Sequence, residues 1–262
     1  MNKILLTNDD GFSAQGLRAL RESLSARWDV VVVAPATEQS AVSHSLTLRR
    51  PLRVNRLDQS LFSVEGTPTD CVLLAIHQLL PEKPDLLVAG INHGPNLGDD
   101  VTYSGTVAAA IEATQLGIPS MAISTIGHNF AYAAQLVPYL VEKVFSIGIP
   151  HRVLLNVNFP DRPPDQVKGI RLTRLGKRTY QDTVTRESDP DGAAYYLIGG
   201  SNLTWTGGED TDFAAVEKGM ISITPLRVDL TDQESIPRLR GLEVDFRTTL
   251  TGQGSRQTED QT

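Results

Sequence analysis

The feature that most constrains the fold is the alternation of short apolar runs with helical patterns over residues 1–160 of this 262-residue chain. Such alternation is typical of parallel β-α-β units, because a parallel pair of strands needs a crossover connection that is usually a helix. The sequence therefore predicts an α/β fold built on a doubly wound, mostly parallel sheet. The predicted strands are 4–6, 29–34, 86–89, 120–124 and 153–157.

The helical segments between these strands carry recognisable start signals. Leu17, Leu20 and Leu24 recur at helical spacing in a segment that Ser13 is expected to cap. A hydroxyl, a proline and an acid at 67, 68 and 70 predict a helix from 67 to about 80. Two further helices are predicted, from 104 to 117 and from 130 to 147.

The remaining segments alternate polar and apolar residues. Stretches 45–48 and 61–64 are predicted to be edge or crossover strands, and 170–175, 194–198 and 220–224 to form hairpins outside the main sheet. Projecting hairpins commonly pair with a neighbouring copy, so a dimer with an exchanged arm is expected. We interpret the chain as a single domain with a core at 1–160, a hairpin extension at 161–246 and a flexible tail at 247–262.

Composition excludes several classes of partner. The formal charge of −7 argues against a nucleic-acid polymer as the main partner, since that binding depends on Lys and Arg. The lone cysteine, Cys71, rules out an intrachain disulfide and a cysteine-based zinc site, and is expected to be a buried small hydrophobe in a reducing compartment. No run approaches the roughly 18 apolar residues of a membrane span. We therefore expect a cytoplasmic protein without a membrane partner.

Two adjacent carboxylates follow the first predicted strand. Asp9 and Asp10 are followed by Gly11, which lets the backbone turn so that both side chains face one point. In open α/β sheets, ligands bind beyond the carboxyl ends of the strands, and two neighbouring acids there repel each other unless a cation lies between them. An Asp-Asp-Gly triplet by itself also suits an ordinary solvated turn.

Two other loops follow neighbouring strands and would converge on the same edge. They carry the hydroxyls of Ser40 and Ser43 and the amides of Asn92 and Asn96. Oxygen ligands without cysteine select Mg²⁺, Mn²⁺ or Ca²⁺ over zinc or copper. The sequence therefore predicts a site for one divalent ion at this edge.

Ser104, Gly105 and Thr106 open a predicted helix and could supply the complementary half of a phosphate site. A hydroxyl, a residue without Cβ and free backbone N–H groups at a helix N-terminus suit an anion. The same triplet also suits an ordinary N-cap, and the triplet alone favours that interpretation.

Several motifs together resemble the SurE family of stationary-phase survival proteins, from Met1 to about Leu230. These motifs are Thr-Asn-Asp-Asp-Gly (7–11), Glu-Gln-Ser-Ala-Val-Ser (38–43), Gly-Thr-Pro-Thr-Asp-Cys-Val (66–72), Gly-Ile-Asn-His-Gly-Pro-Asn-Leu-Gly (90–98) and Tyr-Ser-Gly-Thr-Val-Ala-Ala-Ala (103–110). Later segments with Tyr-Tyr-Leu-Ile-Gly-Gly, Asp-Thr-Asp-Phe-Ala-Ala-Val and Ile-Ser-Ile-Thr-Pro-Leu extend the resemblance. The chain departs from the family at 41–44, where Ala-Val-Ser-His stands in place of the frequent Gly-Ala or Gly-Val followed by Ser-Asn.

The resemblance implies a Rossmann-like three-layer core, an oligomer built on dimers and a metal-dependent phosphatase acting on nucleoside 5′- and 3′-monophosphates. Matching the motifs residue by residue assigns the metal to Asp9, Asp10, Ser40 and Asn92. The expected phosphate-binding residues are Ser43, Asn96, Ser104, Gly105 and Thr106.

The hypothesis for the reaction follows from this assignment. One Mg²⁺ or Mn²⁺ ion would polarise a phosphoryl oxygen and activate a water that attacks phosphorus, while the helix amides at 104–106 stabilise the developing charge. Asp9 and Asp10 are the candidate catalytic residues. The sequence leaves open a regulatory protein that binds nucleotide and metal without turnover.

Two rival enzyme classes fail on their residues. A haloacid-dehalogenase-type phosphatase needs its nucleophile and acid two residues apart, which residues 9–12 do not provide. A dinucleotide-binding oxidoreductase needs Gly-x-Gly-x-x-Gly after the first strand, and residues 8–13 lack it.

The other ionisable residues receive structural interpretations. His93 and His44 are expected at the pocket wall, and Asp210 and Asp212 as a helix cap rather than a metal pair. The remaining histidines are expected at surface or core positions; they are His77, His128 and His151. The arginines near position 50 could engage a polyphosphate or an acidic neighbouring subunit, but a solvated strand face is the expected position; they are Arg49, Arg50, Arg53 and Arg56.

Overall fold

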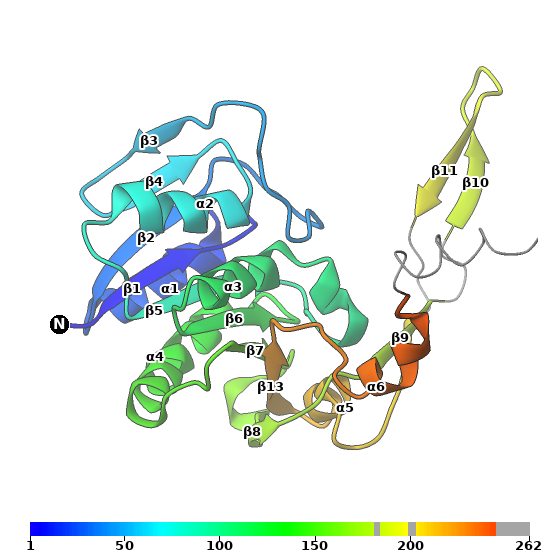
Figure 1. The fold of residues 1–262 in the computed structure, drawn as a ribbon. Helices are drawn as coiled ribbons and strands as arrows, with labels where there is room; N and C mark the ends of the chain where they lie inside the picture. The colour runs from blue at the N-terminus through cyan, green and yellow to red at the C-terminus, as the bar shows by residue number, and fades with distance from the viewer. Residues whose placement is uncertain (181–183, 199–202, 245–262) are drawn as a thin grey trace, which may run out of the picture. The chain divides into compact units, whose positions relative to one another are not determined.

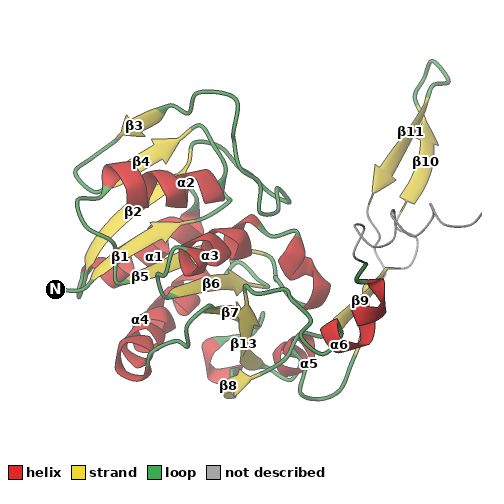
Figure 2. Cartoon of the chain, in the orientation of Figure 1, coloured by secondary structure: helices red, strands yellow, loops and turns green. Residues whose placement is uncertain are grey.

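A mostly parallel sheet forms the centre of the compact unit Met1–Val228 (Figures 1 and 2). The computed structural model describes residues 1–180, 184–198 and 203–244. Within these residues the main sheet has nine strands in the order β3-β4-β2-β1-β5-β6-β7-β13-β8. Their bounds are β1 Lys3–Thr7, β2 Asp29–Pro35, β3 Val54–Arg56, β4 Leu61–Val64, β5 Leu86–His93, β6 Ser120–Thr125, β7 Val153–Phe159, β8 Gly169–Leu172 and β13 Met220–Arg227.

The pairing of the central strands confirms the predicted α/β class. β1 pairs in parallel with both β2 and β5, and β6 continues the parallel run from β5 to β7. Only the pairs β3–β4 and β13–β7 are antiparallel within the described part of this sheet. The three loops that follow β2, β1 and β5 therefore lie side by side at one edge.

Helices cover both faces of the sheet and make the predicted three layers. α1 (Gln15–Ser25) and α4 (Phe130–Ile147) pack on one face, and α2 (Pro68–Leu74) with α3 (Gly105–Gln115) on the other. Successive residues of a strand point to opposite faces, so Ile4 and Leu6 pack toward α1 and α4 while Leu5 packs toward α2 and α3. Because helices cover both faces of the sheet, the central strands bury most of their side chains, which explains their continuous apolar runs.

The starts of two helices test the predicted caps. Thr67 caps α2 through a full capping box with Asp70, as predicted, and the helix continues through a π-helical turn, η1 (Ala75–Leu79). The prediction for Ser13 is wrong, because α1 begins after Ala14, which makes no side-chain cap hydrogen bond.

The predicted strand at 45–48 is also wrong. The Thr47 amide and hydroxyl both donate to the Asp70 carboxylate, at 2.9 and 2.7 Å, and the Thr67 hydroxyl donates to the Ser45 carbonyl at 2.8 Å. This segment therefore pairs with the start of α2 instead of with a strand. The edge strand is β3.

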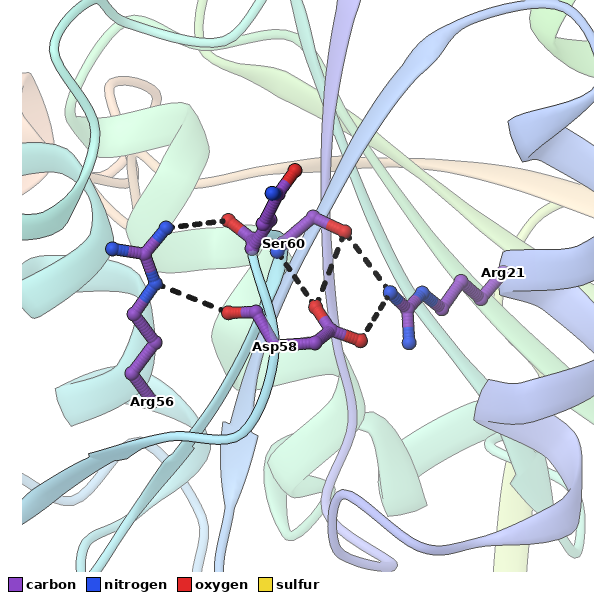
Figure 3. Close-up of polar contacts among 5 residues, drawn as sticks. Arg21, Arg56, Asp58 and Ser60 are labelled. Carbon is purple, nitrogen blue, oxygen red and sulfur yellow. Dashed lines mark hydrogen bonds and ion pairs between the residues drawn. The ribbon is translucent and has the colours of Figure 1, made fainter.

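The turn between β3 and β4 is tied to α1 by polar contacts, which Figure 3 shows. Arg21 donates to the carboxylate of Asp58 at 2.8 Å and to the hydroxyl of Ser60 at 2.9 Å. Arg56 is exposed, and it donates to the Asp58 carbonyl at 3.1 Å within the same turn. These contacts hold the edge of the sheet against the helix layer.

Two of the segments predicted to lie outside the sheet belong to it. β13 pairs antiparallel with β7, and β8 pairs in parallel with β13, so they extend the main sheet. Two small sheets do lie outside it: β9 (Lys177–Tyr180) with β12 (Leu203–Thr206), and the hairpin of β10 (Val184–Ser188) with β11 (Ala194–Ile198). Alternation predicts a strand but does not specify its partner.

The shorter helices complete the described chain. They are η2 (Gly98–Thr102), η3 (Pro164–Gln166) and α5 (Asp212–Glu217), with α6 (Ile236–Leu239) and η4 (Arg240–Leu242) in a second unit that begins at Asp229. The predicted tail at 247–262 lies outside the described residues. No helix in the described ranges has the length and apolar character needed to cross a bilayer.

Candidate active site

A polar pocket lies where the loops after β2, β1 and β5 meet. Its volume is about 350 Å³. Asp9, Ser40 and Asn92, predicted from three separate loops, all line it. The full lining is Asp9, Ser40, Ala41, Asn92, His93, Pro95, Asn96, Asp100, Tyr103, Ser104 and Arg178.

The Asp-Asp-Gly segment makes the turn that the sequence predicts. Gly11 has a φ of +96°, and its carbonyl accepts a hydrogen bond from the Asn8 amide at 2.9 Å. The Asp9 carbonyl accepts from the Gln39 N–H at 2.7 Å, which ties the loop after β1 to the loop after β2. Left-handed φ values favour glycine, so the turn depends on Gly11.

Burial raises the pKa of both carboxyl groups. Asp9 is buried, and this burial raises its pKa above the usual value. The pKa of Asp10 is raised to about 6, first by burial and then by the charges of Asp9 and Glu38, while the His93 backbone N–H lowers it. When both groups are ionised, the site carries two adjacent negative charges, which a bound cation would stabilise.

The start of α3 holds Asp9 in place. The Thr106 hydroxyl donates a short hydrogen bond to the Asp9 carboxylate. The Thr106 and Gly105 backbone N–H groups also lower the pKa of Asp9. A Cβ at Gly105 would lie 2.8 Å from the Asp9 Cβ, so only glycine permits this approach. Two residues predicted to bind phosphate thus contact a predicted metal ligand.

Ser104 is both the N-cap of α3 and a residue of the pocket wall. Its hydroxyl accepts from the Val107 N–H at 3.1 Å, as an N-cap, and the residue also lines the pocket. Gly105 and Thr106 are absent from the pocket lining among the described residues.

The other predicted metal ligands differ in their exposure. Ser40 is exposed and donates to Glu38 at 2.7 Å, while Asn92 is half-buried and its amide donates to the Gly94 carbonyl at 2.9 Å. An amide that donates through nitrogen turns its oxygen elsewhere, so Asn92 keeps an oxygen available as a ligand.

Ser43 lies outside the pocket lining formed by the described residues. Its hydroxyl donates to the Thr102 carbonyl at 2.6 Å and its N–H donates to the Tyr103 carbonyl at 3.1 Å. His44 next to it hydrogen-bonds Glu112 of α3 at 2.7 Å. These contacts anchor the loop that carries Ser40.

Asn96 is held by three hydrogen bonds from β7 that the sequence analysis missed. Asn158 accepts from the Asn96 N–H at 2.8 Å and donates to its carbonyl at 3.0 Å. Asn156 donates to the same carbonyl at 2.7 Å. The Asn96 side chain donates to Ser124 at 2.8 Å. The signal was the pair of asparagines inside an otherwise apolar strand, where polar side chains must find partners.

Arg178, Asp100 and Tyr103 also line the pocket and were missed. Arg178 lies on β9, which follows the predicted core in sequence, and no local pattern relates it to Asp9. Asp100 lies just after the motif at 90–98, and no residue pattern marks it as part of the site.

The other ionisable residues singled out in the sequence are His93, Asp210 and Asp212, and each has a defined contact. His93 lines the pocket and stacks on His128 with ring centroids 4.2 Å apart. Asp210 pairs with Arg174 at 2.7 Å. The Asp212 carboxylate accepts from the Gly98 and Gly176 N–H groups, at 2.8 and 2.9 Å. Asp212 therefore joins two loops. Its carboxylate also accepts from the Phe213 N–H in the first turn of α5 at 2.9 Å, although the N-cap residue itself is Thr211.

The donor set suits one hard divalent cation. It combines two carboxylates whose pKa values are raised with hydroxyl and amide oxygens, which are ligands for Mg²⁺ or Mn²⁺. No group of three or more His, Cys, Asp or Glu with metal-binding arrangement occurs in the described ranges. The four predicted ligands, Asp9, Asp10, Ser40 and Asn92, would leave several coordination positions of the ion to water or substrate.

Comparison with known proteins gives a consistent result. A family model described as survival protein SurE matches residues 4–182. The 5′-nucleotidase SurE of Geotalea uraniireducens (strain Rf4) is 51% identical over 242 residues, covering 91% of this chain and 98% of that protein. The 5′-nucleotidase SurE of Aeromonas hydrophila is 52% identical over 244 residues, covering 90% and 96%. The crystal structure of the SurE protein from Aquifex aeolicus superposes with a TM-score of 0.85 at 44% identity, covering 92% of this chain and 100% of that one.

Proposed function

We propose, from the premise that this chain belongs to the SurE family, that it is a 5′-nucleotidase that hydrolyses nucleoside monophosphates to nucleoside and phosphate. Relatives that align with 91% and 90% of this chain are named 5′-nucleotidase SurE. We extend the proposal to nucleoside 3′-monophosphates, because a phosphate site recognises the phosphoryl group in either position.

The observation that carries the proposal is the convergence in one pocket of Asp9 and Ser40, from the loops after β1 and β2, with Asn92 near the end of β5. Asp10 is adjacent, and its pKa is raised to about 6 by burial and by the neighbouring charges of Asp9 and Glu38. Oxygen ligands from these four residues would hold one Mg²⁺ or Mn²⁺ ion. When bound, such an ion supplies positive charge to a phosphoryl oxygen and lowers the pKa of a coordinated water.

The chain's own residues prepare the pocket for a phosphoryl group. Thr106 and Gly105 fix the orientation of Asp9, and Asn158 and Asn156 fix the backbone of Asn96 at the pocket wall. The N-terminus of α3 adds the partial positive charge of the helix dipole beside the pocket. In the overall reaction, an oxygen of water forms a bond to phosphorus and the bond to the nucleoside oxygen breaks. The attacking water loses a proton, and the leaving oxygen gains one, so the products are phosphate and nucleoside.

The test is phosphate release from a panel of 5′- and 3′-nucleoside monophosphates with Mn²⁺, Mg²⁺ or EDTA. Asp10→Asn should abolish metal-dependent release, whereas Asp165→Asn, which changes an exposed acid in η3, should not. Wild-type activity in EDTA would contradict the metal site. Metal and nucleotide binding without release would instead support a regulatory protein without turnover.

We also propose a homodimer or a dimer of dimers in which the hairpin extension takes part. Tyr196 on β11 is 62% exposed and its neighbours Tyr195 and Leu197 are also exposed, an apolar group unusual on a solvent-facing hairpin. A sedimentation mass of one chain at micromolar concentration would contradict this. With its single cysteine, the chain suits the reducing cytoplasm.

A further inference from the structure

We infer that Arg178 binds the phosphoryl group of the substrate, as a cation supplied to the pocket by β9. This inference rests on the proposed function and deepens it. The phosphate-binding residues assigned from the motifs are all uncharged, and Arg178 adds a cation to them. Arg178 lines the same pocket as Asp9, Ser40, Asn92 and Asn96.

The charge of the pocket creates the need for such a residue. A phosphomonoester carries roughly −1.5 to −2 charge at neutral pH. Asp9 and Asp100 line the pocket, and Asp10 lies next to Asp9. One divalent ion can offset the Asp9–Asp10 pair, but the substrate then brings its own charge. Among the described residues that line the pocket, Arg178 provides the guanidinium, and no lysine accompanies it.

Two contacts hold the guanidinium at the pocket wall. Arg178 forms a short ion pair with Asp100 through Nη1, and both side chains are largely buried, at 18% and 15% exposure. Its guanidinium carbon lies 5.6 Å from the ring centre of Trp205, a cation–π distance. Trp205 in turn stacks on Phe213, with ring centres 5.2 Å apart. The rings therefore support the guanidinium from β12 and α5.

The backbone near Arg178 is fixed as well. Its N–H donates to the Asp99 carboxylate at 3.1 Å, and β9 pairs with β12 at this residue, opposite Trp205. The pocket wall thus receives a preorganised side chain, which loses little conformational freedom when a ligand binds.

The chemistry of guanidinium favours phosphate as the ligand. Guanidinium presents five N–H donors in a planar fork that matches phosphate oxygens, and its charge is permanent. The ion pair with Asp100 occupies the Nη1 end and sets the direction of the fork. Hydrogen bonds between such a fork and an anion are charge-assisted and comparatively strong.

The test uses inorganic phosphate as the probe and AMP as the substrate. The variants are Arg178→Met, Arg178→Lys and Asp100→Asn, each checked for folding by thermal unfolding. Arg174→Met is the matched control, because Arg174 is an exposed guanidinium paired with Asp210 at 2.7 Å. Phosphate affinity is read from competitive inhibition and from direct binding by ³¹P NMR.

We expect Arg178→Met to weaken phosphate binding and to raise KM for AMP by about tenfold to a hundredfold, the usual effect of losing a charged hydrogen-bond donor. Arg178→Lys should fall between Arg178→Met and the wild type, because it keeps the charge but not the fork. Asp100→Asn keeps the guanidinium, so it should not weaken phosphate binding. Arg174→Met should match the wild type.

A purely structural role gives a different pattern. If Arg178 only ties β9 to η2, then Arg178→Met and Asp100→Asn remove the same ion pair and should lower stability alike, while phosphate affinity stays at the wild-type value. That result overturns the inference. If the wild-type protein releases no phosphate from any nucleotide, the proposed function is overturned instead. In that case the affinity of each variant for inorganic phosphate still shows whether Arg178 binds the phosphoryl group.

Discussion

The hydroxyl of Thr106 donates a hydrogen bond to the carboxylate of Asp9, across 97 residues of sequence. The bond joins the first turn of α3 to the loop after β1. It explains how a buried carboxylate is oriented at the edge of the sheet, and it gives the helix start a role in positioning Asp9.

Thr106→Val should reduce activity without removing any side chain from the pocket lining. The substitution keeps the shape but deletes the donor, and a hydrogen bond to a charged group contributes about 1.5–3 kcal/mol. We expect kcat/KM for AMP to fall by about tenfold to a hundredfold, with weaker Mn²⁺ binding measured by calorimetry. Thr114→Val is the control, since Thr114 lies on the same helix but bonds Ser120 at 2.6 Å. Equal losses in both variants would contradict a specific role for Thr106.

Gly105→Ala should displace Asp9. The added Cβ would lie 2.8 Å from the Asp9 Cβ, closer than real Cβ atoms approach a neighbour, and 3.0 Å from its Oδ2. We expect loss of most activity and a lower Tm. Gly241→Ala, where no atom lies within 4 Å of the added Cβ, should behave as the wild type. Full activity of Gly105→Ala would show that the helix start moves freely.

Asp10→Asn should raise the Tm of the metal-free protein at pH 7.5. The pKa of Asp10 is raised from 3.8 to about 6, so the folded state binds a proton more tightly than the unfolded state. The favourable contribution of the protonated group is complete below pH 3.8 and is lost as pH rises through 6. In EDTA, the difference in Tm between variant and wild type should therefore be largest above pH 6 and shrink toward pH 4.

Added Mn²⁺ should reverse this order. The metal binds the folded wild type and stabilises it, while Asp10→Asn should gain little. A pH-independent difference in EDTA would contradict the raised pKa of Asp10.

Asn158→Ala should destabilise the protein and loosen Asn96. The change leaves the buried N–H of Asn96 without the acceptor that lies 2.8 Å away in the wild type. Losing the partner of a buried donor costs about 1–3 kcal/mol. Urea unfolding should show that loss, and KM for AMP should rise. Asn55→Ala, on the exposed face of β3, is the control and should change neither quantity.

Much of the fold could be predicted because local patterns specify it. The apolar runs of the central strands, the capping box at Thr67 and the glycine turn at Gly11 are each determined by residues close in sequence. The same is true of the convergence of Asp9, Ser40 and Asn92, since adjacent parallel strands bring their following loops together.

Other elements could not be predicted because they depend on the choice of partner. Segment 220–224 has the pattern of a hairpin strand, yet β13 inserts between β7 and β8 of the main sheet. Segment 45–48 alternates like a strand but binds the start of α2 through Thr47. Periodicity determines that a segment is extended and which residues share a face, but a long-range competition decides which neighbour it contacts.

By itself, then, the sequence determined the layered α/β fold, the acidic turn at Asp9 and Asp10 and the oxygen donors that suit a divalent cation. The tertiary structure alone decided that Thr106 orients Asp9, that Asn158 holds Asn96 and that Arg178 reaches the same pocket. The physical reason is that local propensities act over a few residues, whereas these contacts join side chains that approach only after the whole sheet has formed.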